Sequence, residues 1–436
     1  MRRWLRKLLM MGAGFFICGM LFAQEREAYE LAPFNYSSAV PEDGVASLQE
    51  RIASGRLGLG RSDREIVQAL LRELVIPVES QVLVFSKTSL QRQRIGPDRP
   101  RSIFFSDTCY VGWVPSGLVE ITSIDPVIGP IFYAFDPAAA RTNASRCLVR
   151  DADCLRCHGG TFVRGIPGVF VRSVFADGDG DPMLKYGTEV VDFRTPFTNR
   201  WGGWYVTGRH GTALHRGNVQ AAEKDDQLAV DFRRGANVTD LSRFFPAGEY
   251  LTNSSDIVAL LILEYQTAMQ NTLTRASLNS RRMIDYQRNL QRELKEEVTE
   301  EPVYQSVKSV LDSSAREVVD DLLFKDEAEL PEGIKGSSQF AKAFGANAKR
   351  AADGSSLKEL LLKGRLFKNR CSYLIYSDSF LKLPKQLKRK VYRKLAGALR
   401  PVDPDPRYAY LEADERARLV EILRQTFPEF KELHLW

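Results

Sequence analysis

The run Cys154-Leu155-Arg156-Cys157-His158 constrains this chain more than any other feature of its sequence. Two cysteines three residues apart on a helical turn lie on one side of that turn. Their thiols can therefore add across the two vinyl groups of a haem, while the histidine that follows supplies the proximal imidazole to the iron. The pattern predicts one haem c, bound covalently by Cys154 and Cys157, with His158 as the iron ligand.

Three other kinds of site use the same pair of cysteines. A zinc site needs a second ligand pair at finger spacing, but the chain has no second Cys-x-x-Cys and only four histidines. A thiol–disulfide oxidoreductase places its cysteine pair after a buried strand, whereas a polar run at 150–153 precedes Cys154. A plain structural disulfide is the third alternative. We expect the haem site in preference to these.

The N-terminus predicts export. Four basic residues precede an uncharged apolar run at 8–22, and Ala23 before Gln24 offers a small residue for cleavage. This is the pattern of a secretory signal peptide, and an uncleaved N-terminal anchor is the alternative. We expect cleavage after residue 23, a periplasmic or otherwise exported chain, and no transmembrane span in the mature protein. Assembly of c-type haem follows export, which agrees with the motif.

The charge balance gives no reason to expect a nucleic-acid partner. Lys and Arg together number 61 against 55 Asp and Glu. Four of the basic residues and none of the acidic ones lie in the signal segment, so the mature chain is close to neutral. The pI of about 8.9 belongs largely to the precursor. A redox protein is the partner we expect instead.

Export also affects the remaining cysteines, because thiols in an oxidising compartment tend to form disulfides or to bind something. Cys18 lies in the signal segment, which leaves Cys109, Cys147 and Cys371. One disulfide among these three is possible, and the sequence does not choose the pairing.

The second axial position of the iron has several candidates. His210 and His215 lie in a polar, glycine-rich stretch at 208–218, from which a neutral imidazole can reach an iron. His210 is the first candidate, His215 the second and Met183 the third. Two solvated histidines and an open or water-filled iron position are the alternative.

Hydrophobic periodicity and turn residues predict an α+β fold. Short β-like runs are expected at 82–85, 103–105, 118–121, 131–135, 169–175 and 204–206, and a helical turn from near Cys147 into Cys154. Helices are expected at 62–74, behind a capping box at Ser62–Glu65, and at 254–294, 303–324, 338–350, 385–399 and 413–426. We therefore divide the mature chain into a mixed α/β haem-bearing region at 24–245 and a mainly helical domain at 246–436.

Two further patterns carry weaker predictions. The alternating aspartates of Asp177–Asp181 resemble the start of a calcium loop, but Pro182 and Thr188 stand where such a loop needs Gly and Glu. We expect a tight turn between two strands there. The helix at 385–399 has a basic face, which either docks an acidic partner or is simply solvated.

Three stretches together resemble a known group of proteins. These are CLRCHGGTFVRGIPG at 154–168, the stretch at 194–218 that contains RWGGWYVTGRHGTALHRGN, and CSYLIYSDSFLKLPKQLKRKVY at 371–392. They are similar to a family of exported bacterial proteins predicted as single-haem c-type cytochromes. The resemblance implies the haem residues Cys154, Cys157 and His158, and a second site in the loop with His210 and His215. It implies no particular reaction, because the family has no settled activity.

We therefore expect electron transfer through one covalently bound haem. A haem enzyme, such as a peroxidase or another small-molecule oxidoreductase with an open distal position, is the alternative. The length of the chain favours this alternative somewhat, because a plain carrier needs fewer residues. A haem-based sensor that binds a partner through the helical half is a third possibility.

Overall fold

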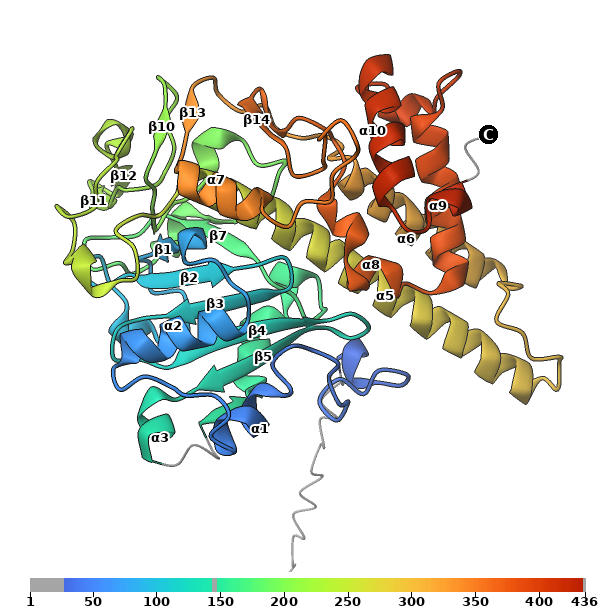
Figure 1. Ribbon diagram of the computed structural model, residues 1–436, viewed down its shortest axis with the longest axis horizontal. Helices are drawn as coiled ribbons and strands as arrows, with labels where there is room; N and C mark the ends of the chain where they lie inside the picture. Colours follow the sequence, from blue (N-terminus) through green and yellow to red (C-terminus); the bar gives the residue numbers. More distant parts are fainter. Residues whose placement is uncertain (1–26, 143–146, 434–436) are drawn as a thin grey trace, which may run out of the picture.

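The computed structural model describes residues 27–142 and 147–433 of the 436-residue chain and shows an α+β fold (Figure 1). The predicted signal peptide lies outside the described residues. Strands dominate the N-terminal half and helices the C-terminal part, as the sequence pattern predicted. Among the described helices, none is long and apolar enough to cross a membrane.

A seven-stranded antiparallel sheet organises the N-terminal half. Its order is β6-β5-β4-β3-β2-β1-β9. The six consecutive strands β1 to β6 form a meander, and β9 pairs with β1 at the end of this meander. The strands are β1 (Val82–Val84), β2 (Arg101–Phe105), β3 (Cys109–Trp113), β4 (Val119–Asp125), β5 (Gly129–Phe135), β6 (Leu148–Arg150) and β9 (Trp204–Tyr205).

The two faces of this sheet bury different partners, because successive side chains on a strand point to opposite sides. On one face, Leu83, Phe104 and Val111 pack in a cluster with helix α2 (Asp63–Glu73). On the other face, Val82 and Phe132 pack in a cluster with helix α5 (Ile257–Glu293). The second face also carries the candidate site described below.

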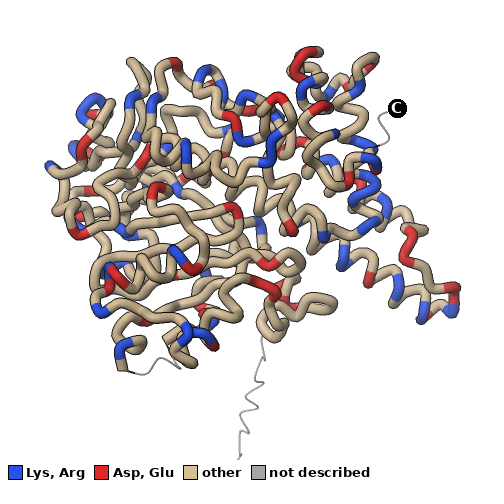
Figure 2. Tube along the Cα trace, in the orientation of Figure 1, with Lys and Arg blue, Asp and Glu red and all other residues tan. Residues whose placement is uncertain are grey.

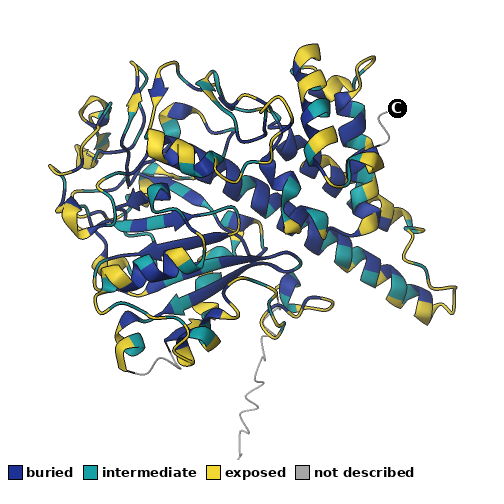
Figure 3. Cartoon of the chain, in the orientation of Figure 1, coloured by how far each residue is buried: buried dark blue, intermediate teal, exposed yellow. Residues whose placement is uncertain are grey.

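Helix α5 connects the sheet with the helical part. Asp256 caps it by accepting hydrogen bonds from the backbone N–H groups of Val258 (2.9 Å) and Ala259 (3.0 Å). Its first half is buried and its far end is exposed (Figure 3). One buried cluster includes residues of the sheet, of α5 and of the C-terminal helices. The division of the mature chain at residue 245 stays a prediction.

The other helices are α1 (Leu48–Ala53), α3 (Pro137–Thr142), α4 (Leu155–His158), α6 (Gln305–Leu322), α7 (Ser338–Gly345), α8 (Asp378–Leu381), α9 (Lys385–Leu399) and α10 (Ala413–Thr426). Four two-stranded pairs complete the fold: β7 (Val171–Val174) with β8 (Thr188–Val191), β10 (Arg209–His210) with β13 (Ile334–Lys335), β11 (Ala222–Lys224) with β12 (Gln227–Ala229), and β14 (Leu360–Lys363) with β15 (Arg365–Phe367).

The segment before the cysteine motif differs from the prediction. A helical turn was expected from Cys147, but strand β6 occupies 148–150 and pairs with β5. The helical turns begin only at Ala152, and Gly159 follows the last residue of α4. Pairing with the sheet overrides the local helical preference here. The predicted tight turn at Asp177–Asp181 is confirmed, with Asp177 N donating to Asp181 O (3.0 Å).

The basic face of α9 is matched by acidic residues of neighbouring segments (Figure 2). Lys388 pairs with Glu429 at 2.8 Å, and Arg389 pairs with Glu301 at 2.5 Å. Lys394 lies 3.1 Å from Asp312 on α6. These contacts favour an internal role for the basic face over the docking of an acidic partner.

Candidate haem-binding site

The cysteine motif lies against the sheet face that packs on α5. Cys154 ends a short 3-10 turn (Ala152–Cys154), and Cys157 and His158 belong to α4, which follows at once. The side chain of Asp151 caps the first turn by accepting from the N–H of Asp153 (2.9 Å). Cys154 is half-buried and Cys157 is exposed.

All three predicted haem residues border one cavity. It has a volume of about 160 Å³ and is partly open to solvent. The floor of the cavity is the sheet, one side is the segment at 154–172, and Leu263 and Thr267 of α5 form another side. The floor residues include Val84, Arg101, Ile103, Tyr110, Gly112, Glu120, Thr122, Phe132 and Trp204.

The imidazole of His158 is held in the orientation that a metal ligand needs. Its Nδ1 lies 2.8 Å from the carbonyl oxygen of Gly168, and its ring packs between Phe132 (4.8 Å between centroids) and Phe170 (5.0 Å). Because a carbonyl only accepts, this contact assigns the proton to Nδ1 and leaves the Nε2 lone pair available. Burial lowers the pKa of His158, which keeps the ring neutral.

A half-buried ion pair lies in the floor of the same cavity. The guanidinium of Arg101 on β2 crosses strand β3 to reach the carboxylate of Glu120 on β4. It passes over Gly112, where a Cβ atom would lie 2.2 Å from Arg101 Nη2, so a side chain at this position would displace the guanidinium. Ser89 and Gln91 each donate to Glu120 Oε1 at 3.0 Å.

This pair places a fixed positive and a fixed negative charge beside the motif. Burial alone would raise the pKa of Glu120, but Arg101 and the hydrogen bonds from Gln91 and Ser89 lower that pKa overall. The carboxylate is therefore ionised. The Nε of Arg101 is buried and has no hydrogen-bond partner in the part of the chain that the structure describes.

The donor set fits a covalently bound haem better than the rival sites. A reactive thiol of an oxidoreductase needs a lowered pKa, whereas burial raises the pKa of Cys154 to about 12. A structural zinc site needs four ligands, and within residues 27–142 and 147–433 no group of three or more His, Cys, Asp or Glu residues is placed to hold a metal ion. Two thiols and one neutral imidazole on an aromatic-walled cavity suit a haem.

His210 and His215 lie elsewhere. Neither borders the cavity that contains His158, and their side chains are buried, with the residues 1% and 3% exposed. Their rings pack on each other with centroids 4.5 Å apart. Both ring nitrogens of His210 are engaged, Nδ1 with Ala213 O and Nε2 with the N–H of Asn237, each at 2.8 Å. The structure therefore does not bring these histidines together with His158.

Met183 does not border the cavity either. Cys109 and Cys371 are buried free thiols. The sequence prediction did not find Arg101 and Glu120, which border the cavity, or Asn271 of α5, which hydrogen-bonds to Val169. Strands and helices far apart in the chain bring these residues to the segment that carries the motif. The one local signal was a glycine, Gly112, inside a strand-like run, which often marks the close approach of another group.

Comparison of the chain with protein families, with curated proteins and with solved structures found no match.

The environment of His215 predicts an acid-sensitive fold. Burial, and then the neighbouring His210, lower the pKa of His215 to about 3. The unfolded chain therefore binds a proton below about pH 6.5 that the folded chain does not bind. The stability that neutral His215 contributes is present above this pH and is lost as the pH falls, by about 1.4 kcal/mol per pH unit. His215→Gln should flatten the dependence of the unfolding free energy on pH between about pH 4 and 6. Urea titrations test this, and an unchanged slope would contradict it.

Proposed function

We propose that this chain is an exported c-type haem protein, with thioether bonds from Cys154 and Cys157 to one haem and His158 as the proximal iron ligand. One observation carries the proposal: the three side chains border one cavity, and Gly168 orients the His158 ring. Export rests on the signal-peptide pattern at 1–23. N-terminal sequencing of the exported protein should begin at or near Gln24.

Electron transfer is the first function we propose for it. A bound haem supplies an iron that exchanges one electron with a redox partner. The residues of this chain hold and tune that group. Phe132 and Phe170 shield the His158 ring from water, and the ion pair between Arg101 and Glu120 fixes the local field. The redox partner protein stays a prediction.

A haem enzyme is the second candidate, and the lining of the cavity favours an open iron position. Among the described residues that border this cavity, His158 is the only histidine, and none is a methionine. The guanidinium of Arg101 and the carboxylate of Glu120 are partly exposed at this cavity and provide a donor and an acceptor for a small polar substrate. Either function is compatible with an open position, but a bis-histidine carrier is not.

The spectrum of the purified haem protein distinguishes these cases. We expect the reduced wild-type protein to bind CO readily, because no second histidine among the described residues borders the cavity. His210→Ala and His215→Ala should leave the spectrum and the CO affinity nearly unchanged. Absorption spectra of both oxidation states, with and without CO, measure this. A low-spin wild-type protein that binds CO only after His210→Ala would restore the closed bis-histidine carrier.

A further inference from the structure

One face of helix α5 is directed at the segment that carries the motif. Leu263 and Thr267 border the haem cavity, and Asn271 follows one helical turn later. The side-chain amide of Asn271 reaches the backbone of Val169 and makes two hydrogen bonds there. Val169 N donates to Asn271 Oδ1 (3.0 Å), and Asn271 Nδ2 donates to Val169 O (2.6 Å). The side chain thus pairs with this residue as a neighbouring strand would.

Gly168, the residue directly before Val169, is hydrogen-bonded to His158. Gly168 N donates to the backbone carbonyl of His158 at 2.8 Å, and the His158 ring donates from Nδ1 to Gly168 O at 2.8 Å. A Cβ atom at Gly168 would lie 2.8 Å from Asn271 Oδ1 and 2.8 Å from Val163 Cβ. Gly168 therefore fits only as glycine, enclosed between the motif loop and the amide of Asn271.

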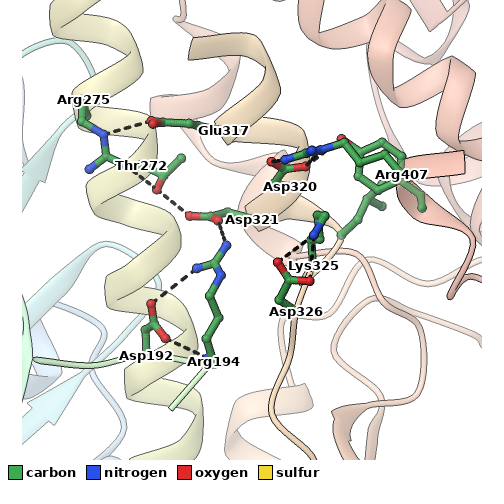
Figure 4. A network of polar contacts seen from close by, with 12 residues as sticks. Asp192, Arg194, Thr272, Arg275, Glu317, Asp320, Asp321, Lys325, Asp326 and Arg407 are labelled. Atoms are coloured by element: carbon green, nitrogen blue, oxygen red, sulfur yellow. Dashed lines mark hydrogen bonds and ion pairs between the residues drawn. The ribbon is translucent and has the colours of Figure 1, made fainter. Parts of the chain in front are cut away.

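The part of helix α5 that carries Asn271 is itself held in place by contacts with α6. The next residue of α5, Thr272, donates to Asp321 of α6 at 2.6 Å, and Arg194 binds the same carboxylate (Figure 4). One turn further on, Arg275 pairs with Glu317 of α6 at 3.1 Å. These contacts hold α5 against α6, so the amide of Asn271 has a rigid base.

We propose that Asn271 is a positioning residue for the proximal ligand, acting on His158 through Val169 and Gly168. This inference rests on the proposed function of His158. The hydrogen bond from Nδ1 to a carbonyl makes an imidazole a stronger donor to its metal, and a stronger donor stabilises the ferric state. When the amide is lost, the Gly168 carbonyl is less firmly held, and the Nδ1 hydrogen bond weakens. The reduction potential then becomes more positive.

The test uses the full-length haem protein matured in a host that attaches c-type haem. Asn271→Leu keeps most of the side-chain volume and removes both hydrogen bonds, Asn271→Ala removes the side chain, and Asn271→Gln keeps the amide on a longer stem. Asn289→Ala is the matched control, because Asn289 is an exposed residue of the same helix that contacts only Asp285 and Arg292 through its side chain.

We expect Asn271→Leu and Asn271→Ala to keep covalent haem, to shift the potential to more positive values and to speed solvent exchange of the His158 Nδ1 proton about tenfold. Asn271→Gln should lie between them and the wild type, and Asn289→Ala should match the wild type. Spectroelectrochemical titration and proton NMR provide the two measurements. If the haem-loaded Asn271→Leu and Asn271→Ala proteins had the wild-type potential and exchange rate, the positioning role of Asn271 would be overturned, and the proposed function would stand. A wild-type protein that matures without haem would overturn the proposed function first.

Discussion

Replacing both Cys154 and Cys157 with alanine is expected to abolish covalent attachment of haem. Each thioether bond needs one of these thiols, and among the cysteines of the described chain only these two border the cavity. The double variant keeps His158 and the aromatic walls, so any haem that remains is held by coordination and packing alone. Denaturing electrophoresis with haem staining measures this, because only covalently bound haem migrates with the denatured chain.

Matched variants separate attachment from folding. Cys154→Ala and Cys157→Ala as single changes should each retain haem through one thioether bond, at lower yield. Cys109→Ala removes a buried thiol that does not border the cavity and should keep full staining. The proposal fails if the wild-type protein matures without haem and instead binds stoichiometric zinc.

The cysteine motif is visible in the sequence because its residues are neighbours in the chain, and haem binding stays a prediction. The spacing of Cys154, Cys157 and His158 already specifies which side chains share one side of a turn. Gly159, directly after His158, likewise marks the observed end of α4. The sequence did not show which residue holds the His158 ring. Gly168 lies ten residues beyond His158, and its role as the acceptor for Nδ1 follows only from the folded loop.

The helices were predicted more closely than the strands. Helix α9 has the predicted bounds Lys385–Leu399, and the capping box of Ser62 and Glu65 opens α2 as expected. Both signals depend on residues within one or two turns. Helix α7 ends at Gly345 rather than near residue 350, where a glycine interrupts the helical preference.

Strand β3 shows why the sheet was harder to predict. The run Cys109–Trp113 was not predicted as a strand, and Gly112 near its end weakens the local preference for one. In the fold, this glycine is what allows Arg101 to cross β3 and reach Glu120. The residue that obscured the strand is therefore part of the site, and its role is apparent only once β2, β3 and β4 are paired in the sheet.

The burial of His210 and His215 could not be predicted for a related reason. A polar, glycine-rich run suggests a solvated loop, but both rings are buried beside Phe197 and Trp201. Strand β10, which contains His210, pairs with β13 more than 120 residues later in the chain. Burial of this kind depends on distant segments and leaves no periodic signal in the run itself.

A buried ion pair lies near these histidines, and removing one of its partners should cause the largest loss of stability that we expect. Arg200 and Glu264 are both 0% exposed and bind each other directly. Arg200 also donates to Thr195 O through Nε (2.9 Å) and Nη2 (2.7 Å). Removing one partner of a buried pair leaves the other charge without compensation, at a cost of about 3–5 kcal/mol. Arg200→Met should therefore lower the unfolding free energy by about 3–5 kcal/mol at neutral pH, measured by urea denaturation.

The pH dependence of this variant identifies the cause. Burial raises the pKa of Glu264 to about 7 even though Arg200 lowers it, and without Arg200 that pKa rises further. A group with a raised folded-state pKa contributes stability that is full below its unfolded pKa, near 4.5, and is lost as the pH rises through the folded value. Wild-type Glu264 titrates near pH 7, so the deficit of Arg200→Met should be nearly constant from pH 5 to about pH 7 and should grow from there to pH 8, by up to about 1.4 kcal/mol per pH unit. Arg200→Met combined with Glu264→Leu should recover much of the loss and remove this added dependence on pH, because no buried charge is left. A deficit in Arg200→Met that is equal at both pH values would show instead that lost packing, and not the uncompensated carboxylate, destabilises the variant.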